Sequence, residues 1–331
     1  MKILFISNGQ GVDYQCDVIF HGLKTLYGKD IYETVDNWFM FNDISSEQKS
    51  KLYGKGFTIT GLLDSKLKNV LTNDETIEKI KLRFFNLIVY GSIHRCKSFF
   101  GLVMQHYPKE KILVIDGEDE INVLKFFIGK SIYFKRELNR NINEVYPISF
   151  GMPKEKIVDE IKEKTRILAH IIPGDLSTYI YDNEKDYYNG YAESYFGKTT
   201  KKAGWDCLRH YEIMANGCIP YFPDLADCPK ETMASFPKEI ILETNRLYEN
   251  NAKEDKILLA YSQRILDYTK QNLTTDVIAK YIIDKALSLG ETKINKIYLR
   301  VQWILYNIKI ILSKVKRRIL RLNLFRRDKT L

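Results

Sequence analysis

The sequence lacks the features of several protein classes. Its five cysteines form no C-x-x-C pair, show no zinc-ligand spacing and are odd in number, so neither a disulfide framework nor a zinc site is expected. The opening MKILFIS is too short for a signal peptide and is expected to form a first strand. There is no internal repeat and no low-complexity linker. These absences favour a globular protein of a reducing cytoplasm, long enough for two domains.

Positive charge is concentrated at the C-terminal end. From residue 291 onward there are twelve Lys or Arg and two acidic residues, a net charge of +10, so the preceding 290 residues carry a net −1 of the total of +9. The pI of about 9 is therefore a property of the tail and gives no reason to expect nucleic acid as a partner.

The basic tail has the periodicity of an amphipathic helix. Apolar residues recur on one face between residues 294 and 322, while basic residues and Asn occupy much of the remainder. Its longest charge-free run, VQWILYNI, is far shorter than the roughly 20 apolar residues of a spanning helix. We expect the helix to lie on an anionic membrane surface, with Trp303 and Tyr306 at the interface. The alternative is a terminal helix packed on the body or on a second protomer.

Short apolar runs alternate with helix-like stretches through the body. Strands are expected at 2–7, 37–41, 86–92, 111–117, 131–135, 145–150, 166–172 and 218–222, and helices at 16–28, 78–84, 120–129, 154–164 and 205–217. This alternation predicts an α/β fold of two Rossmann-like domains with parallel sheets. The expected division is 1–150 for the first domain, 151–290 for the second and 291–331 for the tail.

Residues 201–224, KKAGWDCLRHYEIMANGCIPYFPD, read as a basic loop, a helix and a buried strand. Asp206 is expected to cap the helix and Gly217 to end it in a left-handed conformation. Lys198, Lys201 and Lys202 precede the helix N-terminus, where free N–H groups and the helix dipole favour an anion. A diphosphate would be well held there.

One face of this helix carries polar side chains. Arg209, Glu212 and Asn216 share it by their spacing. The arginine could make charge-assisted bonds to phosphates, and Glu212 could accept two hydroxyls of a ribose. The alternative for Arg209 and Glu212 is an exposed ion pair, which is common on any helix.

The segment CLRHYEIMANGCIPYFPD resembles the donor-site helix of GT-B glycosyltransferases, in particular the R-x-x-E-x-x-x-x-G-C-I-P pattern of exostosin-like and CgeB-like members. The resemblance implies that Arg209 and the preceding lysines neutralise the leaving nucleoside diphosphate and that Glu212 holds the ribose. More weakly, residues 1–28 resemble the first strand, Gly-containing loop (Gly9, Gly11) and helix of the acceptor-side half. The sequence lacks the E-x7-E motif of the retaining family, so the resemblance does not imply retaining chemistry.

The acceptor half offers two candidates for a catalytic base. Inverting transfer needs a carboxylate or histidine within hydrogen-bond reach of the acceptor hydroxyl. Asp13 follows the first strand, at the sheet edge where ligands bind in doubly wound folds, but it could equally cap the next helix. His94 follows the strand at 86–92 and could face the same cleft, or have a structural role.

Other functions remain open. The acidic run at 116–120, DGEDE, could bind Mn²⁺ or Mg²⁺ as in GT-A glycosyltransferases, although it lacks D-x-D spacing and could also cap a helix. The chain could instead be a non-catalytic peripheral-membrane protein with the sheet as a scaffold. A nucleotide-sugar epimerase would turn over a donor without any acceptor.

The favoured expectation is a GT-B-type glycosyltransferase that moves a sugar from a nucleoside-diphosphate sugar to a glycan or lipid-linked acceptor in bacterial surface-polysaccharide synthesis. Neither a metal nor another cofactor is expected, because positive groups and a helix end would stabilise the leaving diphosphate. The tail would hold the enzyme on the cytoplasmic, inner face of a membrane.

Overall fold

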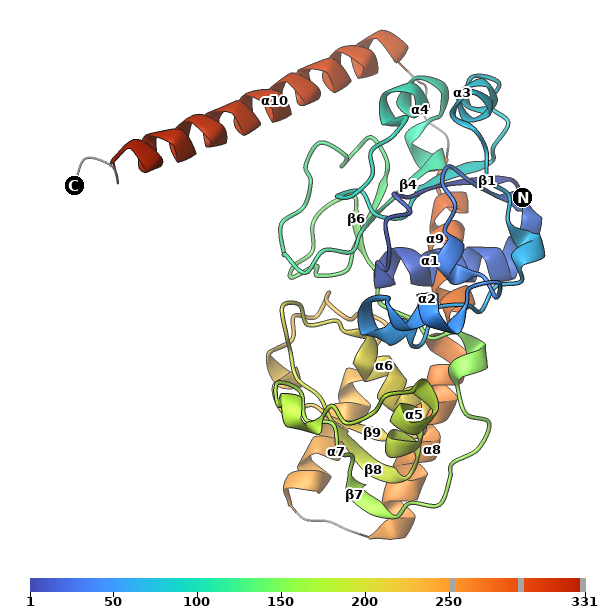
Figure 1. Cartoon of the computed structure of the whole chain (residues 1–331), viewed down its shortest axis with the longest axis vertical. Helices are drawn as coiled ribbons and strands as arrows, with labels where there is room; N and C mark the ends of the chain where they lie inside the picture. Colours follow the sequence, from blue (N-terminus) through green and yellow to red (C-terminus); the bar gives the residue numbers. More distant parts are fainter. Residues whose placement is uncertain (251–253, 291–294, 328–331) are drawn as a thin grey trace.

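The chain folds into two α/β halves, each built on a parallel sheet, and a long C-terminal helix projects from the first half (Figure 1). The computed structural model describes residues 1–250, 254–290 and 295–327, with side chains up to residue 318. The predicted α/β fold with parallel sheets and a C-terminal helix is confirmed.

The first sheet has the order β2-β1-β3-β4-β5-β6 and is parallel throughout. Its strands are β1 (Ile3–Ile6), β2 (Ile31–Glu33), β3 (Leu87–Tyr90), β4 (Ile112–Asp116), β5 (Ile132–Lys135) and β6 (Val145–Pro147). Successive residues of a strand point to opposite faces, and both faces of this sheet are buried, which explains the uninterrupted apolar runs. One face packs on α1 (Tyr14–Tyr27) and α9 (Thr275–Leu287), the other on α3 (Asn73–Lys81) and α4 (Phe100–His106).

The second sheet is smaller, with the order β7-β8-β9. Its strands are β7 (Arg166–Leu168), β8 (Ser194–Lys198) and β9 (Ile219–Tyr221), and the surrounding helices are α5 (Glu184–Ala192), α6 (Leu208–Ala215), α7 (Lys238–Glu249) and α8 (Asp255–Asn272). The loop after α6 turns directly into β9 because Gly217 takes a left-handed φ of 61°, as predicted.

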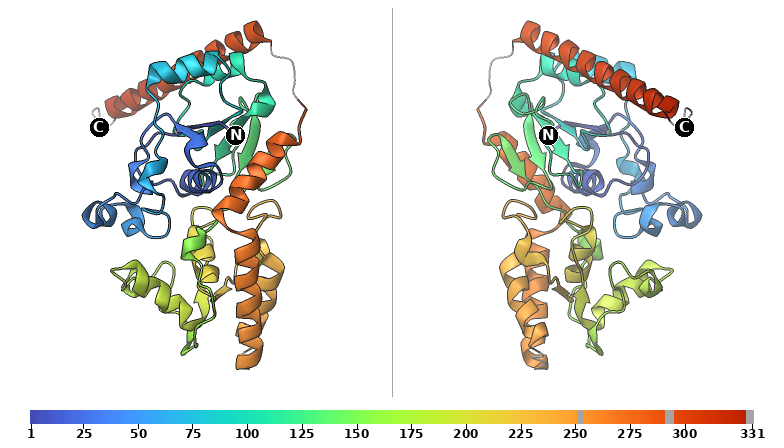
Figure 2. Two further views of the ribbon diagram at one scale, coloured as in Figure 1. Left: turned by 90° about the vertical axis from the view of Figure 1, so that its right-hand side faces the viewer. Right: turned by 90° about the vertical axis from the view of Figure 1, so that its left-hand side faces the viewer.

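The chain crosses between the halves twice, near residue 151 and again between α8 and α9. The two crossings are bonded to each other, since Met152 N donates to Leu273 O at 2.7 Å and Thr275 N donates to Met152 O at 2.9 Å. Helix α9 then packs on α1 so closely that a Cβ at Gly22 would lie 2.0 Å from Thr275 O. The second half therefore returns a helix to the first, and α8 and α9 run along one side of both (Figure 2).

Several expected elements are wrong. Residues 37–41 contain a short 3₁₀ helix (Trp38–Met40) instead of a strand, and β2 and β8 have no counterpart among the expected strands. No helix forms at 120–129. Instead, the Phe127 side chain packs on Phe100 of α4, with ring centroids 4.7 Å apart. The helix expected at 154–164 is reduced to one 3₁₀ turn (Lys154–Lys156), after which the backbone of Val158 bonds to Ala215.

Helix α10 (Lys296–Arg327) has two apolar stripes with different environments. Trp303 and Tyr306 pack on Phe126, and Trp303 also packs on Phe100, so these two side chains are not at a free surface as the sequence suggested. A second set is half or more exposed: Ile297, Tyr298, Ile304, Leu305, Ile311 and Leu312. Ile294, Ile319 and Leu322 lie outside the described side chains. In the part of the chain that the structure describes, no helix combines the length and apolar character needed to cross a bilayer.

Candidate functional site between the two sheets

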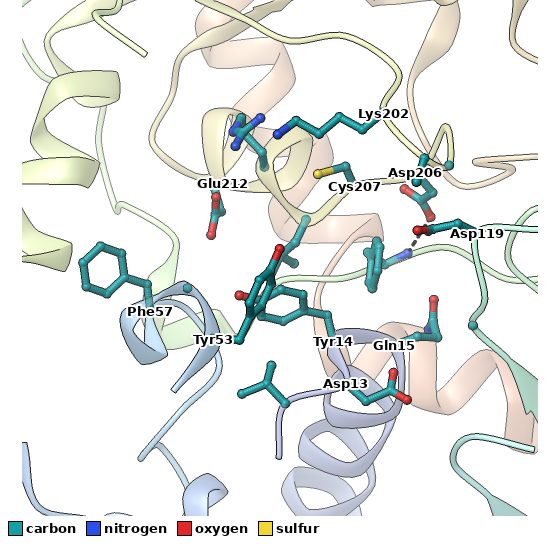
Figure 3. A pocket seen from close by; sticks show the side chains of 18 of the residues that line it. Asp13, Tyr14, Gln15, Tyr53, Phe57, Asp119, Lys202, Asp206, Cys207 and Glu212 are labelled. Atoms are coloured by element: carbon teal, nitrogen blue, oxygen red, sulfur yellow. Dashed lines mark hydrogen bonds between the residues drawn. The ribbon is translucent and has the colours of Figure 1, made fainter. Parts of the chain in front are cut away.

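A cavity of about 680 Å³ lies where the two halves face each other (Figure 3). The first half contributes the start of α1 and the loops that follow β3, β4 and β5, while the second contributes the loops after β7 and β8 and the first turns of α6. The cavity thus lies at the carboxyl ends of strands from both sheets, which is where ligands bind in open parallel α/β folds.

The first turn of α6 and the loop before it present two cations to this cavity. Arg209 and Lys202 both line it. Arg209 Nη2 lies 3.4 Å from the hydroxyl of Tyr179, and its guanidinium lies over the Tyr179 ring. Burial alone would raise the pKa of Tyr179, but the Arg209 and Lys202 cations lower it. The Arg209 and Lys202 cations therefore create a positive potential at this end of α6.

Glu212 lies one turn further into α6 and is buried, with 8% of its surface exposed. It lines the same cavity and accepts hydrogen bonds from Tyr187, at 2.6 Å, and from Thr58 of the other half. Burial raises the pKa of Glu212, against the opposing effect of these two hydrogen bonds. Arg209 and Glu212 therefore do not form the exposed ion pair of the alternative interpretation. A carboxylate offers about four acceptor positions, so Glu212 can accept further hydroxyls.

The remaining donor-side candidates are spread over different environments. Lys198 is the last residue of β8, and the ammonium of Lys201 lies over the Trp205 ring. Neither residue lines the cavity, whereas Lys202 does. Asn216 is buried and donates to Glu212 O, which closes the end of α6. Gly217 packs against Ile161, where a Cβ would lie 2.3 Å away. These last two shape the helix that carries Arg209 and Glu212.

Asp13 has both roles that its sequence position allowed. It caps α1 by accepting from Cys16 N, and it lines the cavity. Arg95 Nε lies 3.1 Å from its carboxylate and also lines the cavity. Gly9 and Gly11, with φ of 61° and 114°, turn the loop that leads to Asp13 without lining the cavity themselves.

His94 and Asp116 belong to a buried network, whereas Glu118 and Asp119 of the acidic run at 116–120 line the cavity. Asp116 Oδ1 is 2.8 Å from Lys135 Nζ, and Oδ2 is 3.1 Å from His94 Nε2 and accepts from Tyr133. Asp119 pairs with Arg136. Within residues 1–250, 254–290 and 295–327, no group of three or more His, Cys, Asp or Glu is arranged to hold a metal ion. Asp116, Glu118 and Asp119 are thus each close to a cation of their own half, Lys135, Arg95 and Arg136 respectively.

The sequence analysis does not identify several residues that line the cavity. Its aromatic lining comes from five separate segments: Tyr14, Tyr53 with Phe57, Phe150, Tyr179 with Tyr181, and Tyr187. Thr58 has a φ of 73°, which is rare for a β-branched residue, and it bonds to Glu212 across 154 positions of sequence. The 22 tyrosines are the only signal in the sequence for such a lining, and they do not say which tyrosines meet.

Asp206 is not the cap of α6 as predicted, since Cys207 occupies that position. Its carboxylate turns inward, where it accepts from Phe150 N at 3.1 Å and from the Tyr211 hydroxyl at 2.8 Å. Burial raises the pKa of Asp206 to about 7. Asp206 therefore connects the start of α6 to Phe150, next to the first crossing of the chain between the two halves.

This pKa predicts a pH-dependent stability difference between wild type and Asp206→Asn. The unfolded carboxyl has a pKa near 3.8, so between pH 4 and pH 7 the unfolded state loses the proton that the folded state keeps. The free energy of unfolding of wild type should fall over this range relative to that of the variant, by at most about 4 kcal/mol. Denaturant titrations at pH 4, 5, 6 and 7 measure it; parallel profiles for the two proteins would contradict the assignment.

No model of a known protein family matches the sequence, and neither does any curated protein. Among solved structures, the chain is similar to an alpha-glucosyltransferase in complex with UDP and a 13-mer DNA, with 11% identity, a TM-score of 0.48 and coverage of 86% of this chain and 99% of that one. It is also similar to Anabaena HepE in complex with UDP-glucose, with 9% identity, a TM-score of 0.45 and coverage of 87% and 100%. At such values neither similarity says what this chain binds.

Proposed function

We propose that the chain is a glycosyltransferase that binds a nucleoside-diphosphate sugar in the interdomain cavity and transfers the sugar to a glycan or lipid-linked acceptor. The observation that supports this most is the arrangement around the start of α6, where Arg209 in the first turn and Lys202 in the preceding loop share one cavity with the buried carboxylate of Glu212. A nucleoside diphosphate has the complementary order of groups, with an anionic diphosphate next to a ribose diol.

The cations would act on the leaving group. When the bond between the anomeric carbon and the phosphate oxygen breaks, negative charge grows on the diphosphate, and Arg209, Lys202 and the free N–H groups of α6 are already in place to stabilise it. No metal is required for this role. The volume of about 680 Å³ lies within the range of small-molecule sites in proteins.

The acceptor would be activated from the opposite wall. Asp13 lines the cavity from the first half, whereas His94 is not among the lining residues and has its Nε2 directed at Asp116. We therefore assign Asp13 as the base: it takes the proton of the acceptor hydroxyl as that oxygen bonds to the anomeric carbon. The neighbouring Arg95 orients the carboxylate.

We further propose that α10 holds the enzyme on the inner, cytoplasmic face of a bacterial membrane, where lipid-linked or polysaccharide acceptors are assembled. The helix projects from the body (Figure 1) and combines exposed Leu305, Ile311 and Leu312 with exposed basic side chains. A helix of this kind inserts its apolar face to the headgroup level and attracts anionic lipids.

Neutralising four basic residues of the tail should weaken this attraction. Each Lys or Arg near an anionic surface contributes about 1 kcal/mol, so changing four of them to Gln should weaken binding to phosphatidylserine vesicles roughly 1,000-fold. The variant replaces Lys309, Lys314, Lys316 and Arg317. Its control replaces four exposed lysines of the body, namely Lys66, Lys185, Lys230 and Lys256. Co-sedimentation that falls equally for both variants, or that is unaffected in both, would contradict the proposal.

Calorimetry with a panel of nucleoside diphosphates and their sugars tests the proposed function. Wild type in EDTA should bind one nucleotide and its sugar derivative. Binding only after Mn²⁺ is added would indicate a metal-dependent site at residues 116–120. No binding under either condition would favour a non-catalytic membrane protein. Conversion of the bound sugar nucleotide into another sugar nucleotide without an acceptor would indicate an epimerase.

A further inference from the structure

Gln15, at the start of α1, is a buried polar residue whose bonding capacity is unused. It is 1% exposed and lines the interdomain cavity, yet neither Oε1 nor Nε2 has a hydrogen-bond partner among the residues that the structure describes. Its stem is fixed against Gly117, where a Cβ would lie 2.7 Å from that of Gln15. Four charged side chains that line the same cavity are paired with each other, Asp13 with Arg95 and Arg136 with Asp119.

An unpaired buried carboxamide destabilises the folded state, because its polar atoms lose their bonds to water without gaining others. A Met of similar volume would fill the same space on α1 without this cost. The cost is offset if a ligand in the cavity supplies the missing partners. The carboxamide carries one acceptor oxygen and one donor nitrogen side by side, so the ligand must present a donor and an acceptor at adjacent positions.

We propose that Gln15 binds two neighbouring hydroxyls of a sugar ring, one donating to Oε1 and the other accepting from Nε2; this rests on the proposed function of the cavity. A phosphate would satisfy only the nitrogen, an ammonium only the oxygen, and an apolar group neither. A vicinal diol satisfies both. Buried groups of this kind discriminate strongly, because a ligand that lacks the hydroxyl leaves them unpaired.

The position of Gln15 agrees with a sugar subsite. In Figure 3, Glu212 and Phe57 lie on one side of Lys202 and Cys207, whereas Gln15 and Asp119 lie on the other. With the ribose at Glu212 and the diphosphate at the N-terminus of α6, the next group of a sugar nucleotide extends toward the side of Gln15. The sugar bound there is either the transferred one or that of the acceptor.

Calorimetry on Gln15→Met distinguishes these two sources. Affinity for the nucleoside diphosphate alone should stay within twofold of wild type. If Gln15 holds the transferred sugar, affinity for the sugar nucleotide should fall about tenfold. If it holds the acceptor, that affinity stays, and binding of a panel of methyl glycosides in the presence of the nucleoside diphosphate should fall instead. The control is Gln263→Met, on the exposed face of α8.

Thermal melting separates a ligand-binding role from a structural one. Because Gln15 has no partner to lose, the melting temperature of Gln15→Met should equal or exceed that of wild type. Sugar-nucleotide and glycoside affinities that both equal wild type, or a lowered melting temperature with unchanged affinities, would overturn the proposal. If wild type binds no nucleoside diphosphate, the proposed function is wrong. The role of Gln15 is then decided by titrating methyl glycosides without nucleotide. A tenfold lower glycoside affinity in Gln15→Met supports the proposal, and an affinity equal to that of wild type overturns it.

Discussion

Arg209→Met is expected to weaken the binding of the nucleoside diphosphate roughly 10- to 100-fold. A hydrogen bond between a charged donor and a charged acceptor contributes about 1.5 to 3 kcal/mol, and Arg209 is the cation that α6 itself directs into the cavity. The fold should survive, because the only hydrogen bond of its side chain is the 3.4 Å one to Tyr179, within the described residues. Calorimetry on wild type and variant measures the loss.

The matched control for this change is Arg166→Met. Arg166 is exposed at the amino end of β7, on the sheet edge away from the cavity. Its replacement removes the same charge from the same half and should leave the affinity within twofold. An equal loss in both variants would mean that net charge alone attracts the nucleotide. Full affinity in Arg209→Met would exclude α6 as the diphosphate site.

Asp116→Ala is expected to lower the free energy of unfolding by about 3 to 5 kcal/mol. The side chains of Asp116 and Lys135 are both fully buried and 2.8 Å apart, so the variant leaves an ammonium without a counter-charge. Burial alone would raise the pKa of Asp116, yet the adjacent His94 and the charge of Lys135 lower it, so this pair favours the charged carboxylate. Denaturant unfolding measures the effect.

Two further variants test whether this loss of stability comes from the buried Asp116–Lys135 pair. Asp159→Ala, at an exposed position, should change stability by no more than about 0.5 kcal/mol. The double variant Asp116→Leu/Lys135→Met removes both charges and should recover most of the loss, since apolar groups can replace a buried ion pair. A loss below 1 kcal/mol in Asp116→Ala, together with stabilisation of wild type by Mn²⁺, would instead identify residues 116–120 as a metal site.

The fold could be predicted where burial and local pattern agree. Strands such as Ile3–Ile6 are apolar because both faces of the sheet are covered, and Gly217 ends α6 because its φ of 61° suits glycine. The prediction failed where distant packing decides the structure. Residues 120–129 have a helical pattern, but Phe127 packs on Phe100 of α4 and Tyr306 of α10. Asp206 has the residue type of a helix cap but is drawn inward by Tyr211.

The site shows the same division between local and distant information. Arg209 and Glu212 lie on one short helix, so their spacing alone placed them on a common face. The partners of Glu212 come from elsewhere: Tyr187 is 25 positions away and Thr58 is 154 positions away. Gln15 has no distinguishing sequence signal, since only its burial without partners marks it. A single sequence cannot specify which distant segments meet at a cavity.

Hydrogen exchange of wild type with and without the bound nucleoside diphosphate, in EDTA, tests most directly whether the donor site lies at α6. The amides of residues 202–212, which form the basic loop and the first turns of this helix, should show the largest slowing of exchange when the nucleotide is present. Those of residues 116–120, across the same cavity, should change less. Protection confined to residues 116–120, appearing only with Mn²⁺, would contradict the account.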